Sequence, residues 1–200
     1  MSETLKDILK NIIHCNNVYE LGGLSGSSKA LLISLLQNID VNPKKHITPT
    51  IVVCESFEVA EVLVNDIYYF FGKKGVYFFP FWDVLPYDNF SPHKGLVAQR
   101  FKTLDALINQ NFRILVTTTN ALMQRFIPRI TFKKNTIHLD CKFQEGLKNI
   151  QKKFLFSGYN LVDLVEDQGE FSTHGLILDI FPINMKNPLR IEFSNTMKIL

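Results

Sequence analysis

The segment Thr50–Cys54 reads TIVVC, and this unbroken run of mostly β-branched residues constrains the fold more than any other stretch. A strand with one solvated face alternates apolar and polar residues. A continuous run is instead typical of a strand buried on both faces of a parallel sheet. Ser56 follows as a candidate N-cap, and then comes a helical stripe that Gly72 ends: Ala60, Leu63, Ile67 and Phe70. A parallel sheet needs such a helix, because the chain must cross back before it starts the next strand.

Strand and helix patterns continue to alternate through the first 126 residues. Short strands are predicted at Gly75–Phe79 and Ile114–Thr118. Between them lies a helical stripe: Val97, Phe101, Leu104 and Ile108. This alternation implies right-handed crossovers and a sheet covered by helices on both faces. We therefore predict that residues 1–126 form an α/β domain, with an open parallel sheet like that of a P-loop NTPase.

The alternation stops near Ile127–Arg129, and residues 127–200 show a different pattern. A short helix at Asn120–Phe126 leads there into a basic loop, and a longer helix is predicted at Phe143–Phe156. Strands are predicted at Thr136–Leu139, Asn160–Val165, Gly175–Phe181, Leu189–Phe193 and Thr196–Leu200. Several strands around one helix predict a second domain, small and of the α+β class, with an antiparallel sheet.

A Gly-rich segment bears on whether the first domain can bind a nucleotide. It follows a β-like run at Val18–Leu21 and precedes a helical run at Leu31–Ile39, which is the context that a phosphate-binding P-loop requires. A P-loop reads G-x-x-x-x-G-K-[ST], where backbone N–H groups and the Lys hold the phosphates and the hydroxyl holds Mg²⁺. The alternative is a plain Gly-rich turn between a strand and a helix.

On this frame the loop departs from the pattern at two of its key positions. Gly23 and Lys29 fit, but Ser28 replaces the second glycine and Ala30 replaces the hydroxyl residue. Because an alanine cannot ligate a metal, we predict a degenerate nucleotide loop without hydrolysis. The residues of this loop are Gly23, Gly26, Ser28, Lys29 and Ala30. An active NTPase would also need an acidic residue after a buried strand, for which Glu55 is a weak candidate, and no spacing assembles a catalytic pair.

Cysteine and histidine spacing argues against disulfides and metal sites. The three cysteines, Cys15, Cys54 and Cys141, are odd in number and far apart, which suits a reducing cytosol. The five histidines never fall at a metal-ligand spacing. The N-terminus has helical periodicity rather than the apolar run of a signal peptide, and no segment approaches the ~18 apolar residues of a membrane span. We expect a cytoplasmic protein with no metal, membrane or small-molecule partner.

The formal net charge of +3 is spread along the chain. The most basic stretch, Arg129–Lys153, has seven basic residues against Asp140 and Glu145. The stretch Asp163–Asp179 has five carboxylates and no Lys or Arg. Direct DNA binding through Arg129–Lys153 is therefore one alternative, since nucleic acids are bound by basic stripes. The preferred interpretation of both stretches is a solvated face.

Two longer stretches are distinctive. Phe79–His93 is a loop rich in proline and aromatic residues, which we expect to pack on the body as a rigid cover through Trp82, Tyr87 and Phe90. Gly169–Phe193 alternates as a hairpin. Its returning strand projects Arg190 and Glu192 from one face, where a cross-strand charge pair is the plain structural expectation.

Together these stretches resemble the N-terminal module of the bacterial transcription-repair coupling factors (Mfd). Phe79–His93 is similar to the family run F-x-x-W-[DE]-x-L-P-Y-[DE]-x-[FL]-S-P-[HS], which is followed by an arginine, here Arg100. Gly169–Pro182 is similar to G-E-[FY]-x-x-R-G-x-[LI]-[LI]-D-[LI]-F-P, and Pro188–Ser194 to P-x-R-[IL]-[DE]-F-F. Thr117–Arg125 matches a third family block. The module is also similar to the damage-recognition protein UvrB.

The resemblance implies a UvrB-like fold that has lost its ATP site, with UvrA bound by the second domain. Of the residues with which the family contacts UvrA, Arg190 is retained and His174 replaces an arginine. Phe193 matches the first phenylalanine of the family's F-F pair, and Ser194 replaces the second. Histidine is mostly neutral at pH 7, so both departures are expected to weaken the contact. We expect RNA polymerase, DNA, ATP and Mg²⁺ to be bound by other domains of the family.

Overall fold

The computed structural model describes residues 9, 12, 18–38, 48–85, 87–137, 139, 146–193 and 197–199. Its chain divides into two compact units. The first unit contains Met1–Trp82 and Thr103–Gln124, and the second contains Asp83–Lys102 and Arg125–Leu200. Each unit has its own sheet and its own hydrophobic core, so the predicted α/β fold with a parallel sheet, followed by a unit with a second sheet, is confirmed.

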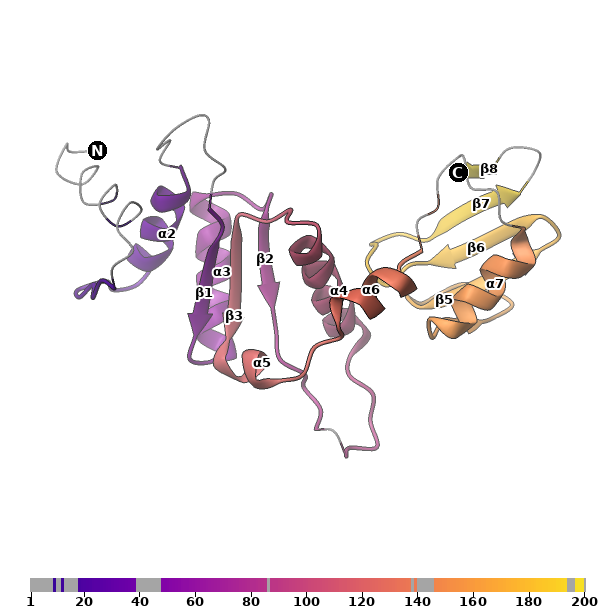
Figure 1. Ribbon diagram of the computed structural model, residues 1–200, viewed down its shortest axis with the longest axis horizontal. Coiled ribbons are helices and arrows are strands. Elements are labelled where there is room, and N and C mark those ends of the chain that lie inside the picture. Colours follow the sequence, from indigo (N-terminus) through magenta and orange to yellow (C-terminus); the bar gives the residue numbers. More distant parts are fainter. Residues whose placement is uncertain are drawn as a thin grey trace. The chain divides into compact units, whose positions relative to one another are not determined.

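The first unit is built on a parallel sheet in the order β1-β3-β2 (Figure 1). Its strands are β1 (Thr50–Cys54), β2 (Val76–Phe79) and β3 (Ile114–Thr118). Its helices are α2 (Ser28–Asn38), α3 (Phe57–Phe70), α5 (Thr119–Met123) and part of α4 (Lys94–Ile108), which has residues in both units. Ser56 caps α3 as predicted, because its hydroxyl accepts a hydrogen bond from the Val59 N–H.

Helices cover both faces of this sheet. The stripe of α3 packs on one face, where Ala60 and Ile67 are fully buried against Ile114 and Val116. Part of α4 packs on the other face through Leu104 and Leu107, against residues of β2 and β3. The doubly covered sheet predicted from the alternation of patterns is therefore present.

The strand that is buried on both faces is β3, and the prediction of this role for β1 is wrong. All residues of β3 are buried, whereas Ile51 and Val53 of β1 are 58% and 48% exposed. Strand β1 lies at an edge of the described sheet, and the part of α4 on that face contacts β2 and β3 instead. A β-branched run thus identified a strand correctly but placed it wrongly within the sheet.

The predicted strand at Val18–Leu21 does not form. These residues have no regular secondary structure, and Val18, Tyr19 and Leu21 are exposed. A strand needs a neighbour for its backbone hydrogen bonds, and no described strand pairs with this segment. The Gly-rich loop therefore lacks the preceding strand that the P-loop context requires.

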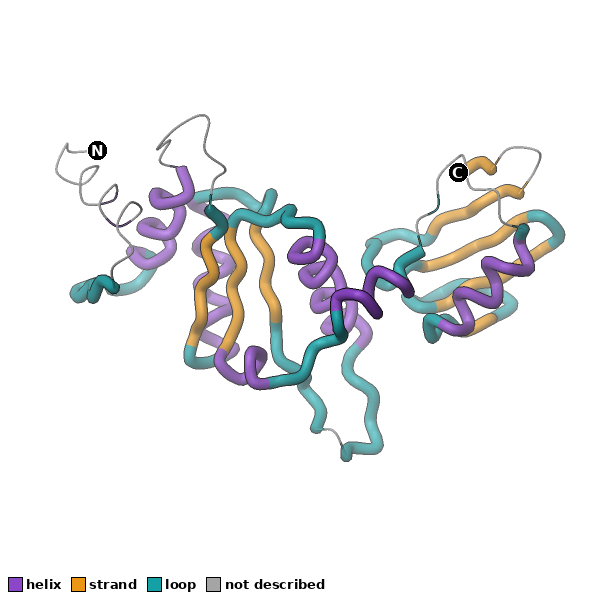
Figure 2. Tube along the Cα trace, in the orientation of Figure 1, coloured by secondary structure: helices purple, strands orange, loops and turns teal. Residues whose placement is uncertain are grey.

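The second unit has a five-stranded sheet in the order β4-β5-β6-β7-β8 (Figure 2). The strands are β4 (Asn160–Leu161), β5 (Glu170–His174), β6 (Ile177–Phe181), β7 (Leu189–Phe193) and β8 (Met197–Ile199). Strands β5 to β8 form the predicted antiparallel sheet, although β5 itself was not predicted, and the short β4 runs parallel to β5. The helices are α6 (Arg129–Asn135) and α7 (Leu147–Phe156).

Helix α7 covers one face of this second sheet. Its residues Ile150 and Phe154 are buried against apolar residues of three strands: Phe171, Leu178, Ile180 and Ile191. The rings of Phe154 and Phe171 lie 5.4 Å apart between centroids. This layer of side chains is the core of the unit.

Several predicted bounds differ from the structure. The basic loop after Pro128 begins with helix α6, and α7 starts at Leu147 among the described residues, since 143–145 lie outside them. In place of the strand Thr136–Leu139, residues 136, 137 and 139 have no regular structure, and His138 lies outside the described residues. Only Asn160–Leu161 of the predicted strand Asn160–Val165 pairs, because β4 is a short edge strand.

The aromatic loop is not the packed cover that we expected. Tyr87 is 97% exposed and Phe90 is 79% exposed, whereas Trp82 is half-buried. Within the loop, the Leu85 N–H donates to the Asp88 carboxylate at 2.7 Å, and nearer its start the Trp82 N–H donates to the Gln124 side chain at 2.9 Å. Composition alone overstated the burial of these rings.

Candidate functional site: the outer face of the second sheet

The face of the second sheet opposite α7, here called the outer face, carries the charged residues of the hairpin. Strand register places Ser172, Asp179 and Arg190 in one row across β5, β6 and β7. The next row contains His174, Ile177 and Glu192. Successive residues of a strand point to opposite faces, so these rows share the face that α7 does not cover.

Arg190 and Asp179 form a bidentate pair in the centre of this face. The Arg190 Nε and Nη2 atoms donate to the two carboxylate oxygens of Asp179, both at 2.7 Å. The Arg190 side chain is 58% exposed and that of Asp179 is 19% exposed. The fork fixes the plane of the guanidinium while much of it still faces solvent.

The bidentate pair shifts the pKa values of both of its members. Hydrogen bonds from Arg190 lower the pKa of Asp179 below its ordinary value, with smaller effects from the charges of Arg190 and His174. The same hydrogen bonds, which Arg190 donates to Asp179, raise the pKa of Arg190. At neutral pH the site therefore presents a fully charged pair.

His174 stands at the end of β5, beside the tight turn to β6. Its Nε2 atom lies 3.2 Å from the carbonyl oxygen of Asp163, within hydrogen-bond distance. The turn passes through Gly175, whose φ of +61° favours glycine, and Leu176 beyond it is 62% exposed. The imidazole is thus oriented on the outer face, next to an exposed apolar side chain.

An acidic loop borders this face. The Glu170 carboxylate accepts hydrogen bonds from the backbone N–H groups of Glu166 and Asp167, at 3.1 Å and 2.8 Å, and these bonds lower its pKa. Asp167 also pairs with Lys94 at 3.0 Å. The carboxylates predicted to form a solvated face therefore partly serve to hold this loop.

The remaining predicted site residues lie elsewhere. Phe193 points to the α7 side, where it is half-buried against the core, and its N–H donates to the Leu176 carbonyl at 2.8 Å. Ser194 lies outside the described residues. The structure thus places Arg190 and His174 on one face and Phe193 on the other.

Sequence reasoning missed Asp179. It grouped Arg190 with Glu192, which does share the outer face, but the charged partner of Arg190 lies on the neighbouring strand. Counting residues back from the turn between β6 and β7 could have found this pair, because register follows from the turn.

The Gly-rich loop contains a local turn that uses both donors of Ser28. Gly23 and Gly26 have φ values of +74° and +52°. The Ser28 N–H and hydroxyl both donate to the Ser25 carbonyl, at 3.2 Å and 2.6 Å, so these donors are already used. Lys29 is exposed, while Ala30 is fully buried in the core, where a metal-binding hydroxyl could not reach solvent.

Other kinds of site find little support in the described residues. They bring together no group of three or more His, Cys, Asp or Glu side chains that could hold a metal ion. Among the helices that the structure describes, none combines the length and apolar character needed to span a bilayer.

Burial raises the pKa of the Cys54 thiol, and the nearby charge of Lys29 only partly opposes this. This thiol is therefore poorly suited to be a nucleophile.

Comparison with known proteins places the outer face inside a known domain. Residues 137–197, which include α7 and β4 to β7 and end at the first residue of β8, match the family described as UvrB interaction domain. The chain is 28% identical to the transcription-repair-coupling factor of Escherichia coli over 173 residues, or 86% of the chain and 14% of that relative. It is 25% identical to the Bacillus subtilis factor over 195 residues, or 98% of the chain and 16% of that relative.

A third relative with the same name aligns with a shorter part of the chain. The Rickettsia typhi transcription-repair-coupling factor is 30% identical over 138 residues, which is 68% of the chain and 12% of that relative. The chain thus spans less than a fifth of the length of each of these relatives.

Proposed function

Since this chain has the UvrB-homology module of transcription-repair coupling factors, we propose that it is a non-catalytic docking module whose outer face binds UvrA. Arg190 is the residue on which the proposal chiefly depends. It is the arginine that the family hairpin retains, and it lies exposed on the outer face of the matched domain. Asp179 holds its guanidinium in a fixed plane, so little side-chain entropy is lost on docking.

The outer face has the composition of a protein-docking site. A partly exposed bidentate ion pair lies near an exposed apolar residue, Leu176, at the turn next to His174. Arginine is enriched at the centres of protein interfaces, where it contributes more than most contacts. A carboxylate of UvrA would share the Arg190 guanidinium with Asp179.

The two departures from the family pattern determine how tightly we expect this chain to bind UvrA. His174 offers less positive charge than an arginine at neutral pH, and Ser194 cannot fill an apolar pocket as phenylalanine does. Each loss costs about 2 kcal/mol at an interface hot spot, so binding should be roughly a thousandfold weaker than with both residues present.

In this proposal the module takes part in transcription-coupled repair by recruiting UvrA to RNA polymerase stalled at DNA damage. The relatives are named transcription-repair-coupling factors, and the chain spans 14% of the Escherichia coli factor and 16% of the Bacillus subtilis factor, so we expect any ATP-driven step to belong to other parts of such proteins. The chain itself needs no cofactor for docking, because the proposed contact uses side chains alone.

Titration calorimetry of the chain against purified UvrA tests this proposal directly. Arg190→Ala should abolish measurable binding, whereas Lys186→Ala, which removes an exposed charge elsewhere in the same unit, should leave it unchanged. Circular dichroism confirms that each variant is folded. If the folded wild-type chain shows no binding at concentrations of tens of micromolar, or if both variants bind alike, this function is wrong.

A further inference from the structure

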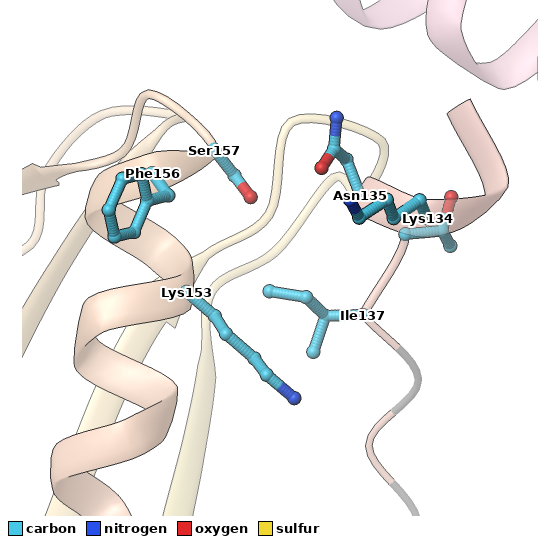
Figure 3. Close-up of a pocket in the computed structure, with 7 residues that line it drawn as sticks. Lys134, Asn135, Ile137, Lys153, Phe156 and Ser157 are labelled. Atoms are coloured by element: carbon cyan, nitrogen blue, oxygen red, sulfur yellow. The ribbon is translucent and has the colours of Figure 1, made fainter. Parts of the chain in front are cut away.

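A pocket lies between the ends of α6 and α7, on the α7 side of the second unit (Figure 3). Its volume is about 190 Å³, and it is lined by Lys134, Asn135, Thr136, Ile137, Lys153, Phe156 and Ser157. In Figure 3, Lys153 extends from α7 toward the segment that carries Ile137. Two helices that are separate in sequence thus each place a lysine at one hollow.

The surface around this pocket is basic. The described residues in 129–157 include Arg129, Lys133, Lys134, Lys148, Lys152 and Lys153, all exposed. No carboxylate occurs among those described residues, and the two acidic residues of the stretch, Asp140 and Glu145, lie outside them. The occupant that complements such a surface is anionic.

An exposed aromatic ring ends the basic surface of α7. Lys148, Lys152 and Phe156 follow one another at intervals of four residues and are exposed, so they form a stripe along one side of the helix. Phe156 is 93% exposed, while the core side of α7 is supplied by Ile150 and Phe154. The ring of Phe156 therefore contributes almost nothing to the core.

We propose that this α6–α7 surface binds single-stranded nucleic acid. The lysines contact phosphates, and a base stacks on the Phe156 ring beside the pocket. Basic grooves with an exposed aromatic ring are how proteins bind single strands without sequence preference, since every base offers a π-face. A duplex keeps its bases stacked inside, so it can use the lysines but not the ring.

The proposed surface is separate from the UvrA-docking face. Helix α7 covers the sheet face opposite Arg190, so a nucleic acid bound to α7 leaves the outer face accessible. This inference therefore goes beyond the proposed function, and either one can fail without the other. It adds a direct nucleic-acid contact to our expectation that DNA is bound by other domains of the family.

Fluorescence anisotropy with a labelled oligothymidylate of about 15 nucleotides tests the proposal on the 200-residue chain. Engagement of four lysines predicts that log Kobs falls with log salt at a slope of about −3. Phe156→Ala should weaken binding about tenfold, and the paired change Lys134→Ala with Lys153→Ala should weaken it further and make the slope shallower. The same sequence as a duplex should bind more weakly.

A charge-matched control makes the test specific. Lys73 and Lys74 are exposed lysines of the first unit, so changing both to alanine removes the same charge from another surface. That variant should bind like the wild type. The proposal is overturned if the control loses as much affinity as Lys134→Ala with Lys153→Ala, or if Phe156→Ala has no effect. Equal competition by poly-glutamate would also overturn it, and would point to an acidic protein partner instead.

Discussion

Asp179 and Arg190 are directly opposite each other on β6 and β7, and both oxygens of the carboxylate accept hydrogen bonds from the guanidinium at 2.7 Å. This relationship couples a structural ion pair to the proposed docking site. A residue that is fixed by its neighbour needs less ordering when a partner binds, which is an advantage at an interface. The same pair also makes the outer face sensitive to acid.

The pH dependence follows from the lowered pKa of Asp179. A carboxyl whose pKa is lower in the folded state adds stability above its unfolded pKa, and this is lost as the pH falls through the folded value. The loss should therefore occur below about pH 4, near the ordinary pKa of aspartate. In a carboxyl NMR titration, Arg190→Ala should raise the pKa of Asp179, while Lys186→Ala should not. An unchanged pKa of Asp179 in Arg190→Ala would contradict the bidentate pairing of these two residues.

Restoring an arginine at position 174 should strengthen docking. His174→Arg adds a permanent charge to the outer face where the family pattern has one, at a residue that is exposed in this structure. We expect UvrA to bind about tenfold to thirtyfold more tightly, measured by calorimetry. His174→Gln is the matched control and should not gain affinity. A gain in both variants would show that charge is not the reason.

The α7 side of the second sheet should carry the stability of the unit. Phe171 is fully buried against Phe154, so Phe171→Ala should lower the free energy of unfolding by about 3–5 kcal/mol. Leu176→Ala, at a residue that is 62% exposed, should change it by less than about 0.5 kcal/mol. Urea denaturation followed by circular dichroism measures both, and similar losses would contradict the described core.

The Gly-rich loop should not regain nucleotide binding when its motif is repaired. Ala30→Thr restores the P-loop hydroxyl in sequence, but Ala30 is fully buried in the core. The larger, polar side chain should lower the free energy of unfolding by about 1–3 kcal/mol instead. Titration with a fluorescent ATP analogue and Mg²⁺ should show no binding by Ala30→Thr, and ATP turnover should be the same in wild type and Lys29→Ala. Binding gained by Ala30→Thr would revive the nucleotide-site alternative.

Local patterns predicted several elements correctly. The stripe of α3 with its Ser56 cap, strand β7 and the antiparallel hairpin all follow from periodicity within a few residues. These features depend on neighbours that are close in sequence, and a single sequence contains that information.

The failures involve partners that are distant in sequence. The TIVVC run could not reveal that β3 would lie between β1 and β2, leaving Ile51 and Val53 exposed. The pairing of Asp179 with Arg190 depends on a register that spans the intervening turn. Likewise, Tyr87 and Phe90 were expected to pack their loop on the body, but no local pattern shows whether a ring meets a packing surface.

Because α7 covers the second sheet on one side alone, alternate residues of each strand are under different selective constraints. A change at Leu178 alters the hydrophobic core, while a change at its neighbour Asp179 alters the outer surface. Partner preference can therefore change over evolutionary time through the exposed outer-face positions, at little cost to folding, while Ser172 on that face is buried. His174, which is exposed at the end of β5, occupies a position of that kind.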